Sequence, residues 1–202
     1  MPESEPVRGQ QAALREAEPR LLRGLRERSP EACKRLCEQF GPRIHRFAAA
    51  RLLGDGQSAE DVMVQALADA TRNIGRFNPR KSTFSAWLYG IVRRKIQGEK
   101  RQQSRLKSVP TSAQVPMEGV AELSQGQDMA AGLVARLEAQ RQVAVLASVL
   151  SDLEMEVLVL HCVDELSARE VGQIVGRSER AIHSILHRAR RKARERLASD
   201  GD

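Results

Sequence analysis

Residues 167–197 read SAREVGQIVGRSERAIHSILHRARRKARERL, and this stretch decides how the chain is expected to fold. Ser167 and Glu170 have the spacing of a capping box, which satisfies the free backbone N–H groups at the start of a helix. Gly176 supplies the permissive backbone of a tight turn, and Ser178 is placed to cap the next helix. Helical periodicity on both sides of the glycine predicts a helix-turn-helix. Its inward positions are Val171, Ile174, Val175, Ala181, Ile182, Ile185, Leu186 and Ala189.

The outward side chains of this motif are candidates for DNA contacts. In a helix-turn-helix the second helix enters the major groove, where residues near its N-terminus reach base edges. The candidates are Arg177, Ser178, Arg180, His183, Ser184, His187 and Arg188. The basic residues in 190–196 are too numerous for base readout, and some of them solvate a helix end. We therefore expect this part of the chain to bind duplex DNA.

Composition favours an all-α protein with a polyanionic partner. Hydrophobic residues make up 41% of the 202 residues, aromatic residues only 3%, and helix-favouring residues dominate. The net charge of +7 makes nucleic acid the leading candidate and an anionic membrane surface the competitor. No apolar run approaches the roughly 20 residues that span a bilayer, and the acidic start MPESEPVRGQ is no signal peptide. We expect a soluble, cytoplasmic protein without membrane insertion.

The pattern along the chain predicts two small helical domains joined by a flexible linker. The expected parts are a loosely ordered tail (1–19), a first domain (20–101), a linker (102–129) and a second domain with the helix-turn-helix (130–202). Pro110 and Pro116 lie in the linker, where helical periodicity is lost.

Helix boundaries are also expected from single residues. The hydroxyls of Ser29 and Ser58 are expected to cap helices, and Gly41-Pro42 is expected to interrupt the chain between two helices. Residues 75–83 break the periodicity before a helix that begins near Phe84. In the second domain, Leu133, Leu137, Ala144 and Ala147 mark a first helix, and Ser151-Asp152-Leu153-Glu154 is a capping box.

Three stretches together resemble the extracytoplasmic-function (ECF, group 4) sigma factors of the sigma-70 family. EVGQIVGRSERAIHSI followed by LHRARRKARERL looks like the C-terminal domain that reads the promoter −35 element. SPEACKRLCEQFGPRIHRFAAARLLGDGQSAEDV is similar to the family's other domain, and NPRKSTFSAWLYGIVRRK resembles its −10 recognition segment. The resemblance covers about 20–101 and 130–197. It implies a transcription initiation factor that directs core RNA polymerase to promoters and catalyses no reaction.

The resemblance also implies roles for residues of the first domain. Glu60, Asp61, Val64 and Gln65 fall where the family binds the clamp helices of the polymerase β′ subunit. The −10 candidates are Asn78, Arg80, Lys81, Ser82, Thr83, Trp87, Arg93 and Arg94, with Lys95 beside them. Loop residues of this set would capture an unstacked base, whereas an aromatic such as Trp87 is more often part of a core. The implied partners are core RNA polymerase (β′ and β subunits), promoter DNA and an anti-sigma factor, with a linker that threads through the polymerase.

The cysteines leave two interpretations. Cys33 and Cys37 lie one helical turn apart, so a redox or metal role competes with a role as small buried hydrophobes. Because Cys33, Cys37 and Cys162 occupy positions where the family usually has buried aromatics, the resemblance favours the buried interpretation.

Two other functions compete with the sigma-factor interpretation. A free-standing helix-turn-helix repressor or activator needs only 130–197, but it leaves the FNPRKSTFSAWL segment without a function. An enzyme could use His45, His161, His183 or His187 for acid-base chemistry, yet no nucleophile-base spacing, phosphate loop or metal-ligand motif accompanies them. We expect no catalytic residue, metal or cofactor. The promoter sequence, the regulon and the inducing signal cannot be read from the sequence.

Overall fold

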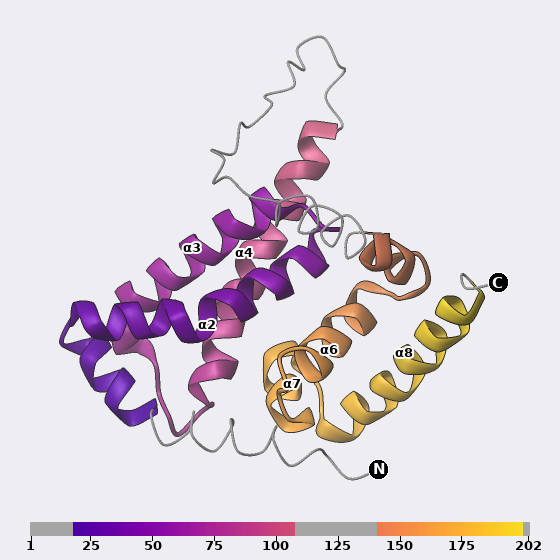
Figure 1. Cartoon of the computed structure of the whole chain (residues 1–202). Coiled ribbons are helices and arrows are strands. Elements are labelled where there is room, and N and C mark those ends of the chain that lie inside the picture. The colour runs from indigo at the N-terminus through magenta and orange to yellow at the C-terminus, as the bar shows by residue number, and fades with distance from the viewer. Residues whose placement is uncertain (1–17, 108–140, 200–202) are drawn as a thin grey trace, which may run out of the picture.

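The first domain is a packed group of helices built on the apolar faces expected from the sequence. The computed structural model describes residues 18–107 and 141–199, and within these ranges it contains no strand. Residues 18–26 are helical, and they are followed by α2 (Pro30–Arg51), α3 (Gly56–Arg72), the 3-10 helix η1 (Ile74–Arg76) and α4 (Phe84–Lys107). Figure 1 shows α2, α3 and α4 lying side by side, and the contacts between all three pairs agree. Phe47 and Tyr89 form an edge-to-face pair in their core, with ring centroids 5.4 Å apart.

The second domain contains the helix-turn-helix. Its described elements are the helical residues 141–149, α6 (Asp152–Cys162), α7 (Ala168–Val175) and α8 (Glu179–Ser199). Both predicted capping boxes are present, at Ser151 with Glu154 and at Ser167 with Glu170. Gly176 has φ of 71°, the left-handed conformation expected of the turn. The predicted all-α fold with two domains is thereby confirmed.

Gly172 allows the two helices of the motif to approach each other closely. A Cβ atom at this position would lie 2.5 Å from the carbonyl oxygen of Arg177 and 3.7 Å from Cγ1 of Ile182. The first distance is shorter than real Cβ contacts, so the crossing of α7 and α8 requires a residue without a side chain here.

Three expectations about helix boundaries in the first domain were wrong. Pro42 lies inside a continuous α2, because the apolar face of this helix continues past the proline and packs on the rest of the domain. Ser29 occupies the N-cap position of α2 without bonding the backbone, since its hydroxyl donates to the Glu31 carboxylate at 2.7 Å. Asp55, and not Ser58, caps α3 by accepting a hydrogen bond from the backbone N–H of Ser58 at 3.1 Å.

Two helices extend past the domain limits expected from the sequence. Residues 18–19 of the expected tail are helical, and 102–107 of the expected linker belong to α4. Within this extension the Ser104 hydroxyl donates to the carbonyl oxygen of Lys100 at 2.9 Å. The remaining tail, the remaining linker and the first residues of the second domain, with Leu133 and Leu137, lie outside the described residues. Among the described helices, none is long and apolar enough to cross a bilayer.

Candidate functional site

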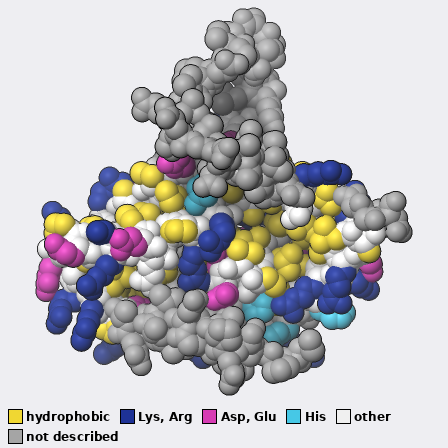
Figure 2. All heavy atoms as spheres, viewed as in Figure 1, with side chains coloured by type: hydrophobic (Ala, Val, Ile, Leu, Met, Phe, Trp, Pro, Cys, Tyr) yellow, Lys and Arg dark blue, Asp and Glu magenta, His cyan; other side chains and the backbone are white. Residues whose placement is uncertain are grey.

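One face of α8 presents the residues expected to read −35 DNA. All seven candidates are exposed: Arg177, Ser178, Arg180, His183, Ser184, His187 and Arg188. The Ser178 hydroxyl accepts a hydrogen bond from the backbone N–H of Ala181 at 3.3 Å, so it caps α8 as expected. In Figure 2, Lys, Arg and His side chains gather over the part of the surface that α8 occupies in Figure 1. The motif therefore offers a cationic face with many hydrogen-bond donors.

The opposite face of α8 fixes its orientation. Ile182, Ile185 and Leu186 are buried against α6 and α7. Lys192 donates to both carboxylate oxygens of Glu154, at 3.0 and 2.9 Å, which ties α8 to the N-terminus of α6. Burial raises the pKa of Glu154, but the hydrogen bonds from Lys192 and from Ser151 lower it by more. The pKa of this carboxyl group is therefore below its ordinary value. Lys192 therefore positions the helix, and the exposed Arg190 adds a contact to the Cys162 sulfur of α6 at 3.4 Å.

The loop between η1 and α4 is an exposed turn held by its own residues. Asn78, Arg80 and Lys81 are exposed, whereas Ser82 and Thr83 are half-buried. The Asn78 side chain accepts a hydrogen bond from the backbone N–H of Arg80 at 2.9 Å. The backbone carbonyl of Asn78 accepts a second one from the backbone N–H of Lys81 at 3.0 Å. Asn78 thus shapes the turn that presents the two cations.

Thr83 and Trp87 join this loop to the core. The Thr83 hydroxyl accepts a hydrogen bond from the N–H of Ala86 at 3.2 Å, which caps the start of α4. The Trp87 ring lies 5.5 Å from Phe77 and 5.8 Å from Phe84, measured between centroids, and it is half-buried. One part of the indole packs on the core while the other remains accessible beside the turn.

The three cations at the middle of α4 have different environments. Arg94 is exposed. Arg93 forms an ion pair of 2.9 Å between its Nε and Oε1 of Glu156 in the second domain. Lys95 lies 2.7 Å from Asp69 on α3, and hydrogen bonds from Lys95 and from Arg72 lower the pKa of this carboxylate. In this arrangement Arg93 and Lys95 are already engaged by carboxylates, which the sequence analysis did not foresee.

The residues expected to contact the polymerase lie together on the outside of α3. Glu60, Asp61, Val64 and Gln65 are all exposed. Val64 is one of the few large hydrophobic side chains in the described residues to be mainly exposed, at 55%. All four side chains are therefore accessible to a partner on this face of α3.

The cysteines are not core residues. Cys37 and Cys162 are exposed, and Cys33 is half-buried against the core. The buried interpretation is therefore wrong for Cys37 and Cys162. The sulfur of Cys162 accepts a hydrogen bond from Arg190 of α8 at 3.4 Å on the surface. In the described part of the chain, no group of three or more His, Cys, Asp or Glu side chains is arranged to hold a metal ion.

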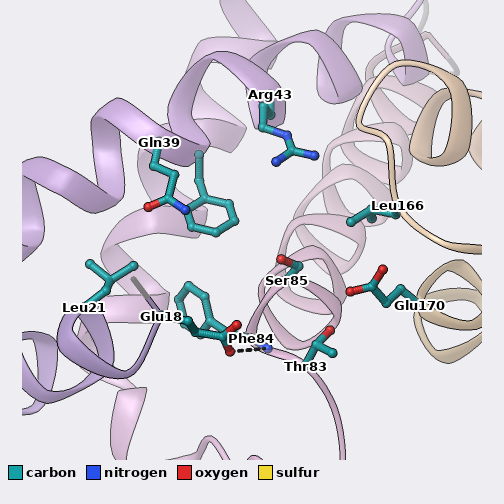
Figure 3. Close-up of a pocket in the computed structure, with 10 residues that line it drawn as sticks. Glu18, Leu21, Gln39, Arg43, Thr83, Phe84, Ser85, Leu166 and Glu170 are labelled. Atoms are coloured by element: carbon teal, nitrogen blue, oxygen red, sulfur yellow. Dashed lines mark hydrogen bonds between the residues drawn. The ribbon is translucent and has the colours of Figure 1, made fainter. Parts of the chain in front are cut away.

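The junction between the two domains contains residues that the sequence analysis missed. Figure 3 shows a pocket there, lined by Glu18, Phe84 and Ser85 of the first domain and by Leu166 and Glu170 of the second. Buried beside this junction are Glu156 and Asp164, at 3% and 0% exposure. The one signal for Glu156 was its place inside the apolar run MEVLVL, where a charged side chain needs a partner.

Comparisons with known families and sequences agree with this geometry. The family model of Sigma-70 region 2 matches residues 36–106, and that of Sigma-70 region 4 matches 140–192. The ECF RNA polymerase sigma factor SigD of Mycobacterium tuberculosis is 25% identical over 174 residues, which cover 85% of this chain and 79% of SigD. The ECF RNA polymerase sigma factor BldN of Streptomyces coelicolor is 27% identical over 172 residues, which cover 84% of this chain and 62% of BldN.

Two solved structures share the fold. CnrH, solved in complex with the cytosolic domain of CnrY, superposes with a TM-score of 0.65 at 23% identity, covering 89% of this chain and 96% of CnrH. The sigma factor RpoE, solved in complex with the anti-sigma factor NepR from Bartonella quintana, gives a TM-score of 0.60 at 23% identity. That match covers 83% of this chain and 97% of RpoE.

Proposed function

Because the chain belongs to the extracytoplasmic-function sigma factors of the sigma-70 family, we propose that it directs core RNA polymerase to promoters through two separate DNA contacts. The exposed face of α8 reads the −35 duplex. The turn at 78–81, with Trp87 and Arg94, holds the melted −10 strand. The α3 face around Val64 docks on the polymerase, in the cytoplasm where transcription takes place.

The observation that carries this proposal is the separation of three exposed surfaces on three different elements. The exposed face of α8 has the residue types that bind base edges and phosphates. The turn combines two exposed cations with a half-buried indole, and an unstacked base can lie on an aromatic ring beside cations. The α3 surface is acidic and apolar, so it suits a protein partner and not DNA.

Reconstitution with core RNA polymerase tests the proposal. The purified full chain is combined with core polymerase, transcripts are mapped across the source genome, and the regions upstream of the start sites are aligned. We expect defined start sites with shared elements near −35 and −10. Failure to bind core polymerase, or transcription that does not depend on added protein, would refute the proposal.

The same experiment separates the proposal from a free-standing regulator. A helix-turn-helix repressor or activator would bind duplex DNA through α8 but would not need the α3 surface. Substituting Val64 with Glu adds charge to the centre of that surface and should abolish polymerase binding while duplex binding by α8 persists. A regulator without a polymerase-docking surface would not bind core polymerase with either Val or Glu at this position.

We also propose an anti-sigma factor as a regulatory partner. The support is the pair of solved proteins with this fold, of which CnrH was solved with the cytosolic domain of CnrY and RpoE with the anti-sigma factor NepR. Affinity capture with the full chain as bait, followed by inhibition of reconstituted transcription by the captured protein, tests this partner class.

A further inference from the structure

The helix at 18–26 precedes the residues that match Sigma-70 region 2, which begin at residue 36. One face of this helix is nevertheless buried in the core of the first domain, through three leucines: Leu21, Leu22 and Leu25. Glu18 at its start is half-buried and lies next to the first turn of α4. A helix outside the matched residues is therefore packed beside an element of the proposed −10 site.

Glu18 satisfies a backbone group at the start of α4, which lies 66 residues further along the chain. Its carboxylate accepts a hydrogen bond from the backbone N–H of Phe84 at 3.2 Å, drawn as a dashed line in Figure 3. The N–H groups in the first turn of a helix have no partner within the helix, and negative charge is favoured there. The Thr83 hydroxyl bonds the N–H of Ala86, so two side chains from different parts of the chain cap α4 together.

Phe84 connects this contact to the turn that is proposed to hold the −10 strand. Its side chain is 1% exposed and packs edge to face on Phe77, with ring centroids 5.6 Å apart. Phe77 directly precedes the turn at 78–81 and Phe84 follows it closely, so this pair fixes both ends of the turn. The Trp87 ring lies against both phenylalanines. A shift of the Phe84 backbone therefore moves the turn and the accessible indole together.

We propose that the helix at 18–26 belongs to the unit that holds the melted −10 strand, with Glu18 as a positioning residue for the first turn of α4. The DNA step rests on the proposed function. The Glu18 carboxylate keeps Phe84, and with it Trp87 and the turn, in the geometry that receives an unstacked base. Without this contact, part of the binding free energy is used to order the first turn of α4, and the affinity for the strand falls.

A positioning role and a purely electrostatic role of Glu18 predict opposite effects on DNA binding. A carboxylate that acts only through its charge repels the phosphates, so its removal raises the affinity for DNA. A positioning carboxylate supports binding, so Glu18→Ala lowers the affinity although the protein becomes more positive. Glu18→Gln separates the two roles, because its side-chain carbonyl oxygen still accepts a hydrogen bond from the Phe84 N–H while the charge is gone.

Amide hydrogen exchange of the full chain, followed by NMR, tests the contact itself without DNA. Exchange of the Phe84 N–H should be several-fold faster in Glu18→Ala than in the wild type, because this group then has no acceptor. In Glu18→Gln the exchange rate should stay close to that of the wild type. Circular dichroism should show unchanged helix content in both variants, which establishes that the variants are folded.

Binding of a short mixed-sequence single-stranded DNA tests the consequence for the −10 site. Trp87 is the sole tryptophan of the chain, so quenching of its fluorescence reports a base beside the turn. The affinity should fall by about threefold to tenfold in Glu18→Ala, as expected for one lost hydrogen bond, and should be retained in Glu18→Gln. Glu27→Ala removes an exposed carboxylate just after the same helix, and this charge-matched control should bind no more weakly than the wild type.

Two results would overturn the positioning role of Glu18. Unchanged exchange of the Phe84 N–H in Glu18→Ala would show that the carboxylate does not hold the start of α4. Faster exchange with an equal or higher affinity for single-stranded DNA would show that the contact does not serve the −10 site. A failure of the proposed function is recognised separately, because replacing Arg80 and Lys81 with Ala would then also leave single-strand binding unchanged.

Discussion

Arg188 and His183 on α8 test how much a single outward side chain contributes to binding of the −35 duplex. Both are exposed, so replacing either with Ala leaves the packing of α8 intact. If they contact base edges, each Ala variant should weaken binding to a −35 duplex by about 1–3 kcal/mol. Fluorescence anisotropy with a promoter fragment measures this loss. Arg194→Ala, on the same helix but beyond the proposed reading face, is the control, and equal losses in all three variants would argue against base readout.

Cys37 was expected to be buried but is exposed, which changes the expected effect of substituting it on stability. Because its thiol is exposed on α2, Cys37→Ser should alter the free energy of unfolding by no more than about 0.5 kcal/mol. Urea denaturation followed by circular dichroism measures this change. Cys33→Ser serves as the comparison, since its half-buried side chain packs against the core and its loss should destabilise more. A larger loss in Cys37→Ser than in Cys33→Ser would contradict the placement of these side chains.

The stability of the helix-turn-helix depends on the close approach of α7 and α8 at Gly172. Gly172→Ala places a Cβ atom 2.5 Å from the Arg177 carbonyl oxygen, so one helix has to shift. We expect this overpacking to destabilise the domain by about 1–3 kcal/mol and to reduce duplex binding. Gly98→Ala is the matched control, because nothing lies within 4 Å of a Cβ atom there and the exposed helix should gain about 0.5–1 kcal/mol. Thermal unfolding of the two variants should shift in opposite directions.

The turn between η1 and α4 should act in strand opening and not in docking. Replacing Arg80 and Lys81 with Ala removes two exposed cations but keeps Asn78, which holds the turn. Open-complex formation should fall by an amount equivalent to about 1–3 kcal/mol for a lost base contact, as measured by permanganate footprinting. Binding to polymerase should not change, and a pre-melted −10 bubble should partly rescue the defect.

The control for the turn is an equal loss of charge elsewhere in the same domain. Lys34 and Arg35 are adjacent and exposed on α2, and replacing both with Ala should leave strand opening unchanged. Normal opening of duplex DNA by the Arg80 and Lys81 variant would remove the turn from the mechanism.

At the scale of the whole molecule, contact between the two domains, here called the closed state, should depend on pH through Asp164, which is buried at their junction. In the structure its pKa is raised from the ordinary 3.8 to about 6, because burial outweighs Tyr89, Arg43 and Arg46, and Glu165 adds to the rise. The closed state thus binds the proton more tightly. Its stabilisation by that proton is complete below 3.8 and is lost as the pH rises through about 6.

Scattering across this pH range measures the effect. The radius of gyration should increase as the pH is raised from 5 to 7, in the window set by the pKa of Asp164. Asp164→Asn carries no ionisable group at this position, so it should stay closed across the range and serve as the control. An Asn variant with the same pH dependence as the wild type would assign the effect to another group.

The sequence by itself determined the helices and the helix-turn-helix. The capping boxes at Ser151 and Ser167 and the left-handed Gly176 are local features, set by residues within about one helical turn. Helical periodicity also identified the inward residues of α8, and the exposed −35 candidates follow from it. These predictions succeeded because their physical cause is local in the chain.

Only the tertiary structure decided which of these surfaces are covered and which charges are paired. Packing of a continuous apolar face carries α2 through Pro42, against the local preference of the proline. The same packing leaves Cys37 exposed and brings Glu156 to Arg93 and Tyr89 to Asp164 across the junction. Burial and ion pairing between distant residues depend on how helices cross in space, and periodicity along one helix carries no information about its partner.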